Sequence, residues 1–188
     1  MEIFDDKIFE NIDFTVKLLP KGEYESCSFI NCNLSSVDVS HYTFIDTNFV
    51  GCNLSLLKLN NTILRDISFK GCKMIGLQFC DANSFGLSMD FDNCILTNSS
   101  FYKLKIKKRN FINSKLNEVD FSEADLAESI FAHSDLSGAV FSFTNIERAD
   151  FRDALNYSID PEKNKIKKSK HSTSALGGLL GKHDLLID

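Results

Sequence analysis

The sequence contains no tryptophan and no apolar run long enough to span a bilayer or to form the core of a secretion signal. With 188 residues, 43% of them hydrophobic, it has the length and composition of one folded domain. We therefore expect a soluble, cytoplasmic protein that does not associate with membranes.

Residue types that build catalytic or metal sites are sparse. The four histidines, at positions 41, 133, 171 and 183, form no pair at helical or strand spacing, and the six cysteines contain no C-x-x-C motif. We expect neither enzymatic activity nor a cofactor, a metal or a small-molecule substrate. An enzyme with a polar cluster on one face is the alternative that these residues leave open.

What the chain does contain is an apolar or aromatic residue at every fifth position. From Phe4 to Met89, and again from Phe91 to Phe151, Ser84 is the one exception among 31 such positions. Fifteen of the 17 phenylalanines fall on this series. Chance does not produce such regularity at this composition, so we interpret it as an internal repeat.

A five-residue period excludes the two simplest structures. On an α-helix each step would advance about 140° past a full turn, and on a straight strand an odd step would send successive side chains to opposite faces. Every unit must therefore contain a bend. Bends in one sense wind the chain into a solenoid whose series points inward, together with the small residue that often stands two positions earlier.

Three segments resemble the A(D/N)LXX unit of pentapeptide-repeat proteins, namely ADLAES (124–129), SDLSGAVF (134–141) and ADFRDA (149–154). The resemblance covers about residues 4–155 and implies an all-β fold, a right-handed quadrilateral β-helix with one pentapeptide per side. Residues 20 apart would stack in columns, with Phe91, Phe111, Phe131 and Phe151 in one and Phe101, Phe121 and Phe141 facing them. Thirty-one units at four per coil predict about seven to eight coils.

Five of the six cysteines occupy the small inward position, namely Cys27, Cys32, Cys52, Cys72 and Cys94. We interpret them as reduced thiols packed in the core. Cys32, Cys52 and Cys72 are 20 residues apart, so their column is the one place where a disulfide or a metal is an alternative.

Two stretches interrupt the repeat. Residues 1–25 include Pro20 and Gly22, which suit a wider turn, and we expect a less regular N-terminal cap there. Between about residues 80 and 91 the series slips by two six-residue steps, through Phe79, Phe85 and Phe91, as at a bulged corner. Such a corner predicts either a kink in the rod or a small protruding loop. We place the β-helix in residues 1–155 and a tail in residues 156–188.

The tail is predicted to hold a short C-terminal α-helix, for which Ser172 and Ser174 are candidate N-caps. Its apolar residues are Leu176, Leu179, Leu180, Leu185 and Leu186. The chain resembles Qnr-type fluoroquinolone-resistance proteins in length and ordering, and in these proteins the C-terminal helix caps the last coil and joins a head-to-head dimer. The resemblance therefore implies a homodimer through these leucines, with a simple cap as the alternative.

Acidic residues outnumber basic ones in the predicted β-helix. Through residue 155 the chain has 22 acids and 15 bases, whereas the tail has 4 acids and 6 bases. The candidate partner-binding acids are Glu118, Asp120, Glu123, Asp125, Glu128 and Asp135. Qnr-type proteins are regarded as DNA mimics that occupy the DNA-binding saddle of DNA gyrase and topoisomerase IV. The resemblance thus implies a type II topoisomerase as protein partner and protection against quinolones.

A second interpretation of these acids is structural. Stacking at 20 residues would place Lys103 over Glu123, Lys105 over Asp125, Lys108 over Glu128 and Lys115 over Asp135, as a ladder of ion pairs. The basic run 103–109 predicts a dipolar rod, and local distortion at Arg109, where a small residue is expected. The alternative function is a pentapeptide-repeat scaffold or structural protein with another protein partner. Direct nucleic-acid binding is not expected, because the chain is acidic and no aromatic platform lies beside the basic run.

Overall fold

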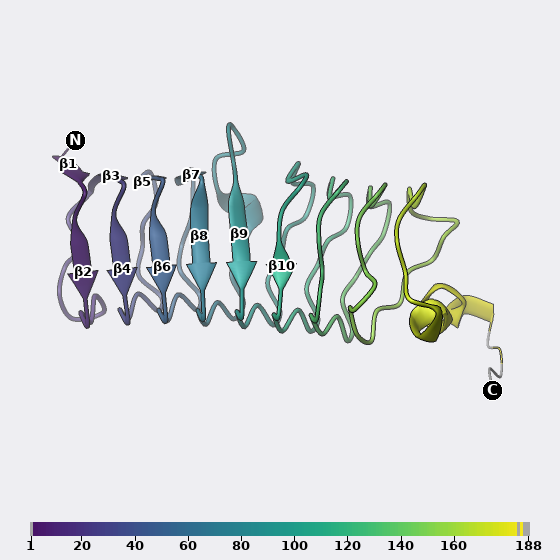
Figure 1. Cartoon of the computed structure of the whole chain (residues 1–188). Coiled ribbons are helices and arrows are strands. Elements are labelled where there is room, and N and C mark those ends of the chain that lie inside the picture. Colours follow the sequence, from purple (N-terminus) through teal and green to yellow (C-terminus); the bar gives the residue numbers. More distant parts are fainter. Residues whose placement is uncertain (1, 184, 186–188) are drawn as a thin grey trace.

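The chain is an all-β parallel solenoid, shown by a computed structural model that describes residues 2–183 and residue 185 (Figure 1). The strands of the first four coils are β1 (Glu2–Asp5) and β2 (Ile8–Glu10), β3 (Gly22–Glu25) and β4 (Ser28–Ile30), β5 (Thr43–Ile45) and β6 (Asn48–Val50), and β7 (Ile63–Arg65) and β8 (Ile67–Lys70). They are followed by β9 (Met89–Asp92) and β10 (Phe111–Ile112).

The strands form two parallel sheets along the rod. One sheet has the order β1-β3-β5-β7, and the other runs β2-β4-β6-β8-β9-β10. Up to β8 each residue pairs with the one 20 positions later, as in Phe9↔Phe29. Single bridges continue the ladder beyond β10 to Asp150↔Lys170. The twenty-residue stacking predicted from the sequence is confirmed, and the ladder runs past residue 155, where the sequence pattern placed its end.

Stacked aromatic rings fill the interior, as the series predicted. The rings of Phe111, Phe131 and Phe151 lie one above another, with successive centroids 5.1 and 4.6 Å apart. The facing column meets them edge-on, since Phe101 and Phe111 have centroids 5.5 Å apart and planes at 86°. Each buried phenylalanine contributes roughly 1.5–3 kcal/mol, which offsets the entropy lost in ordering a five-residue unit.

The required bend lies two residues after most inward positions. Residues there have a left-handed backbone, among them Asn31 (φ 51°), Glu128 (φ 64°) and Phe143 (φ 56°). This conformation costs an ordinary residue about 1–2 kcal/mol. Hydrogen bonds to the next coil offset this cost, as when the Glu128 amide donates to the carbonyl of Glu147 at 2.9 Å.

Small inward residues tie each coil to the one before it. The Thr62 hydroxyl donates to the carbonyl of Val39 at 2.7 Å, and the Cys52 thiol donates to the carbonyl of Phe29 at 3.3 Å. All six cysteines are free, and the five at inward positions are buried, which confirms them as core thiols. No group of three or more metal-binding side chains occurs in the described part of the chain.

The slip inserts two residues into one coil, so that Phe69 pairs with Phe91 instead of residue 89. The 3-10 turn η1 (Phe79–Asp81) leads into a loop of residues 82–88, which protrudes from the rod beside β9 (Figure 1). Of the two alternatives for the slip, the structure shows the protruding loop (Figure 1). Phe85 is 79% exposed, so its predicted inward position is wrong, because the inserted residues carry it out of the coil while Leu87 and Met89 are buried.

Both ends differ from the expectation. Residues 2–10 form regular strands in register with the second coil, and the wider turn lies in residues 14–20. At the other end the predicted α-helix is a 3-10 helix, η2 (Thr173–Leu179), followed by η3 (Gly181–His183). None of the helices described here has the length and apolar character needed to cross a bilayer.

Candidate partner-binding surface

The six candidate acids lie in consecutive coils but do not share a face. Glu118, Glu123 and Glu128 are bend residues at three successive corners. Asp120, Asp125 and Asp135 lie on separate sides, in ladder columns with Val140, Asn145 and Leu155 respectively. The structure therefore distributes these carboxylates around the rod, and a flat partner would meet only some of them.

Neighbouring lysines pair with three of the six acids. Lys103 Nζ lies 3.5 Å from Glu123 Oε2, and Lys108 Nζ lies 3.9 Å from Glu128 Oε2, which confirms two rungs of the predicted ladder. Asp125 pairs at 3.1 Å with Lys107, so the prediction of Lys105 is wrong. A flexible lysine reaches more than one outward carboxylate, and stacking alone does not select the partner.

Asp135 is satisfied by amides instead of by the predicted lysine. The Asn156 and Asn117 side chains donate to its carboxylate at 2.9 and 2.8 Å. These hydrogen bonds, that of Asn156 foremost, lower the pKa of Asp135. No ion pair joins Lys115 to Asp135 within the described residues.

Arg109 keeps the ladder intact. Its amide donates to Ser129 Oγ at 3.2 Å, and its carbonyl accepts from the Ile130 amide at 2.9 Å. The Nε group donates to the carbonyl of Lys107 at 2.9 Å, at the edge of the coil. The predicted local distortion is therefore wrong, because the long side chain avoids the interior without moving the backbone.

A second acidic row lies in the N-terminal half and was not singled out by sequence reasoning. Residues 1–92 contain 13 acids and 7 bases, and none of the seven ion pairs of the described chain involves them. Asp6, Asp46 and Asp66 occupy one bend column between the two sheets, and all three are exposed. We name these three residues, with the adjacent exposed Glu25, the acidic corner. Their spacing in multiples of 20 is the signal that would have revealed it.

The protruding loop rises from the end of the acidic corner. The Asp66 amide donates to Ser88 Oγ at 2.6 Å, and the Ser88 hydroxyl donates to Asp66 Oδ1 at 2.9 Å. The Arg65 guanidinium packs over Gly86 in the same loop, beside the exposed Phe85. Past the loop, the bend column changes its character to Lys108, Glu128, Arg148 and Lys168. The corner is thus acidic before the loop and mainly basic after it.

The tail packs on the last coil with only part of its apolar surface. Leu179 packs against the core, and the Ile159 amide donates to the carbonyl of Gly178 at 2.8 Å. Leu176, Leu180 and Leu185 are 43%, 36% and 56% exposed. Leu186 lies outside the described residues. The three exposed leucines are the ones that the predicted dimer would use.

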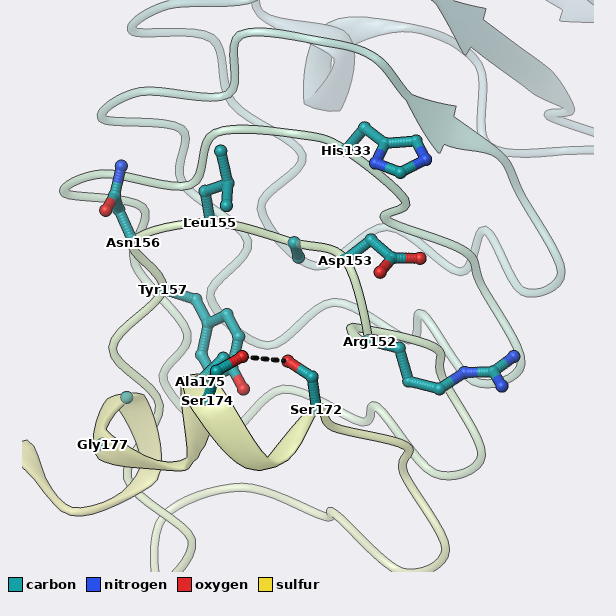
Figure 2. A pocket seen from close by; sticks show the side chains of 12 residues that line it. His133, Arg152, Asp153, Leu155, Asn156, Tyr157, Ser172, Ser174, Ala175 and Gly177 are labelled. Carbon is teal, nitrogen blue, oxygen red and sulfur yellow. Dashed lines mark hydrogen bonds between the residues drawn. The ribbon is translucent and has the colours of Figure 1, made fainter.

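An open hollow of about 530 Å³ lies between the last coils and η2 (Figure 2). His133, Asp153 and Arg152 line one part of it, and Ser172 and Ser174 line another. Asp150 holds the Arg152 guanidinium, with Nη2 to Oδ2 at 2.7 Å. No hydrogen bond joins His133 to a serine in the described chain, so the hollow does not assemble a nucleophile with its base.

Comparisons with known proteins agree with the repeat. A family model described as the pentapeptide repeat region matches residues 23–89 and 87–170. A trypsin-treated form of QnrB1, described as a plasmid-mediated fluoroquinolone resistance protein, matches the fold at 15% identity and a TM-score of 0.65, covering 100% of both chains.

A second trypsin-treated form of QnrB1 matches at 19% identity and a TM-score of 0.50, covering 98% of this chain and 99% of that one. A search of curated protein sequences gave no match. At these identities the structural matches show the fold alone. Since the family model spans most of the ladder, the chain belongs to the pentapeptide repeat family.

Proposed function

We propose that this chain is a non-enzymatic, protein-binding solenoid that occupies the DNA-binding surface of a type II topoisomerase, DNA gyrase or topoisomerase IV, and protects it against quinolones. The observation that carries this proposal is the acidic corner, a row of exposed carboxylates along a narrow rod that take part in none of the ion pairs of the described residues. The likeness of the fold to QnrB1, a fluoroquinolone resistance protein, supports the quinolone-protection part of the proposal.

The charge of the N-terminal half fits partial mimicry of a duplex. With 7 bases and 13 acids, residues 1–92 carry a net charge of 7 − 13 = −6. The strands β2, β4, β6, β8 and β9, at about 4.8 Å apart, extend over roughly 19 Å. A duplex of that length carries about 11 phosphates. The rod has about half this charge. Its affinity for a DNA-binding surface should therefore fall as the salt concentration rises, but less steeply than the affinity of DNA.

The six acids of residues 118–135 form a second part of the proposed surface. Ion pairs cover Glu123, Asp125 and Glu128, and a partner must displace a lysine or accept it into the interface. We therefore expect these residues to contribute less to binding than Asp46 and Asp66, which form no ion pair with any residue that the structure describes.

The proposed protein is a cytoplasmic homodimer, wound as a right-handed β-helix of seven to eight coils. The exposed Leu176, Leu180 and Leu185 support the dimer, and pairing at twenty residues along the rod supports a coil with four five-residue sides. Sedimentation equilibrium should give a dimer for the parent chain and a monomer for Leu176→Ser combined with Leu180→Ser. A parent chain that sediments as a monomer would remove dimerisation from the proposal.

Gyrase supercoiling in the presence of a quinolone tests the function. The purified protein should restore supercoiling, and the double variant Asp46→Lys with Asp66→Lys should need about tenfold more protein, a loss of about 1.4 kcal/mol. Asp153→Lys makes the same kind of charge change at the far end and should behave as the parent. No restoration with gyrase or with topoisomerase IV would overturn the proposal.

The second candidate function is a pentapeptide-repeat scaffold with another protein partner. The observation that favours it is the neutralisation of Glu123, Asp125 and Glu128 by their own neighbours, which reduces the acidic surface of the C-terminal half. Full quinolone sensitivity at every protein concentration, with the rod folded, would select this candidate.

A further inference from the structure

The first coil presents an open sheet edge at β2. This strand ends the six-stranded sheet, so it pairs on one side only within the described chain. The Ser28 amide donates to the carbonyl of Lys7, and the Asn11 amide donates to the carbonyl of Ile30, both at 2.9 Å. Alternate residues of a parallel ladder face alternate neighbours. The odd-numbered residues thus face β4, and the N–H and C=O groups of residues 8 and 10 face the open edge.

The edge of β1 is open in the same way. β1 ends the four-stranded sheet, and the amide of Asp6 donates to the carbonyl of Glu25 at 3.1 Å, on the side of β3. The backbone groups of Ile3 and Asp5 therefore face outward. The outward-facing residues of both edges are two isoleucines and two acids.

Apolar surface accompanies these backbone groups. Ile3 and Ile8 are 69% and 70% exposed. Phe4 and Phe9 begin the two ring columns and are only half-buried, because each has a parallel ring on one face only, Tyr24 at 4.6 Å and Phe29 at 4.7 Å. A further strand on β2 would cover the free face of Phe9 as each later coil covers the ring before it.

The charge around the open edges is mainly negative. Glu2, Asp5, Asp6 and Glu10 are exposed, with Lys7 as the one base in the two strands and their bend, and none of them takes part in an ion pair of the described chain. A second copy placed edge to edge would bring like charges together, which disfavours pairing. A basic strand would instead complement them.

The chain itself shows that a lysine-rich segment pairs with a neighbouring coil of this solenoid through single bridges on either side of a bend at Lys168. Residues 163–170 read KNKIKKSK, and they continue the ladder through Asn145↔Lys165 and Asp150↔Lys170. Ile166 packs against the core, while Lys165 and Lys167 are exposed. A segment of this type combines an apolar inward residue with outward cations. This pattern would complement the exposed ring of Phe9 and the acidic residues beside β2.

We propose that the first coil is a docking site for a basic, extended segment of another protein, which adds a parallel strand to the open edge of β2. Backbone hydrogen bonds to residues 8 and 10 give affinity, as in other cases of strand addition. An apolar residue of the segment covers Phe9, and its cations lie beside Glu10 and Asp5.

A labelled peptide with the sequence of residues 163–171 of this chain is the probe, titrated with the full-length protein by fluorescence anisotropy. Binding should be saturable and should weaken with salt. Ile8→Pro removes an outward donor while leaving the side facing β4, and it should weaken binding at least about tenfold. The double variant Asp5→Lys with Glu10→Lys should weaken peptide binding by a similar factor. It replaces the proline variant as the test if that variant does not fold. Asp153→Lys at the far end should leave binding unchanged.

Several outcomes would overturn the proposal. These are absence of binding at millimolar peptide, equal binding of a peptide with every lysine replaced by glutamate, and equal binding by the folded edge variants. Self-association of the protein alone that is abolished by Ile8→Pro would show that a second copy fills the site. Because the readout is peptide binding, its failure is distinct from failure of topoisomerase protection.

Discussion

His171 stacks on Phe151 where the ring column would otherwise end, with ring centroids 5.5 Å apart and planes within 3°. The Ser169 hydroxyl donates to the carbonyl of Ile166 at 2.8 Å, so it must accept from the His171 Nε2–H at 2.9 Å. The Tyr157 hydroxyl then donates to Nδ1 of the neutral ring at 2.9 Å. A neutral imidazole thus closes the last aromatic column.

The stability of this cap should fall in mild acid. Burial lowers the pKa of His171, against a smaller opposing attraction from Asp150. The folded state therefore binds the proton more weakly than the unfolded state, and stability is lost as the pH falls through about 6.5, the ordinary histidine pKa. The melting temperature should drop between pH 7.5 and 5.5 by on the order of 2 °C. His171→Phe should remove most of this drop, and an equal drop in both proteins would contradict the assignment.

Replacing Phe131 by aspartate should unfold the rod. Its ring is fully buried between Phe111 and Phe151, and a charge in this dry column costs several kcal/mol, at least ~3. Phe131→Leu is the matched control and should cost only about 1 kcal/mol. Thermal melting followed by circular dichroism compares the two, and an unchanged melting temperature for the aspartate variant would refute the inward position.

Reversing the charge of Glu128 should have little effect on stability. Its ion pair with Lys108 spans 3.9 Å, and both side chains are well exposed. Such a pair contributes less than about 1 kcal/mol. Urea unfolding of Glu128→Lys should agree with the parent within that range, whereas a loss above about 2 kcal/mol would mean that the ion-pair ladder supports the fold.

Replacing Phe143 by glycine should stabilise the protein. This residue has φ 56° and is 71% exposed, so it bears the cost of a left-handed bend without the gain of burial. Phe143→Gly should raise stability by about 0.5–1 kcal/mol. Phe143→Ala keeps the unfavourable backbone and should show no comparable gain. If the glycine variant is the less stable of the two, the exposed ring makes a contact that this account lacks.

The interior was predictable from the sequence because one geometric rule governs it. A bend every five residues leaves no other place for the series, and the stacking of Phe111 on Phe131 follows from the twenty-residue coil. The inserted residues obey no such rule, since two extra residues can be absorbed at any bend. The exposure of Phe85 therefore depends on local packing of Leu87 and Met89, which spacing does not encode.

The candidate site was less predictable because long side chains choose among neighbours. Asp125 pairs with Lys107 although Lys105 shares its ladder column. Counting acids along the sequence favoured residues 118–135, where acids are densest. The lysines that neutralise three of these acids lie in the preceding coil, so a count along the sequence does not reveal the pairing. Asp46 and Asp66 are sparse in sequence and stand out only when residues are sorted by column.

The most direct test of the central claim is competition for DNA on the topoisomerase. A labelled duplex is bound to DNA gyrase, and its fluorescence anisotropy is followed as the protein is added at two salt concentrations. We predict that the protein displaces the duplex, less effectively at the higher salt, and that the double variant Asp46→Lys with Asp66→Lys needs about tenfold more. Two results would contradict the account. One is a duplex that stays bound at every protein concentration, and the other is displacement that is equally effective at both salt concentrations and with the double variant.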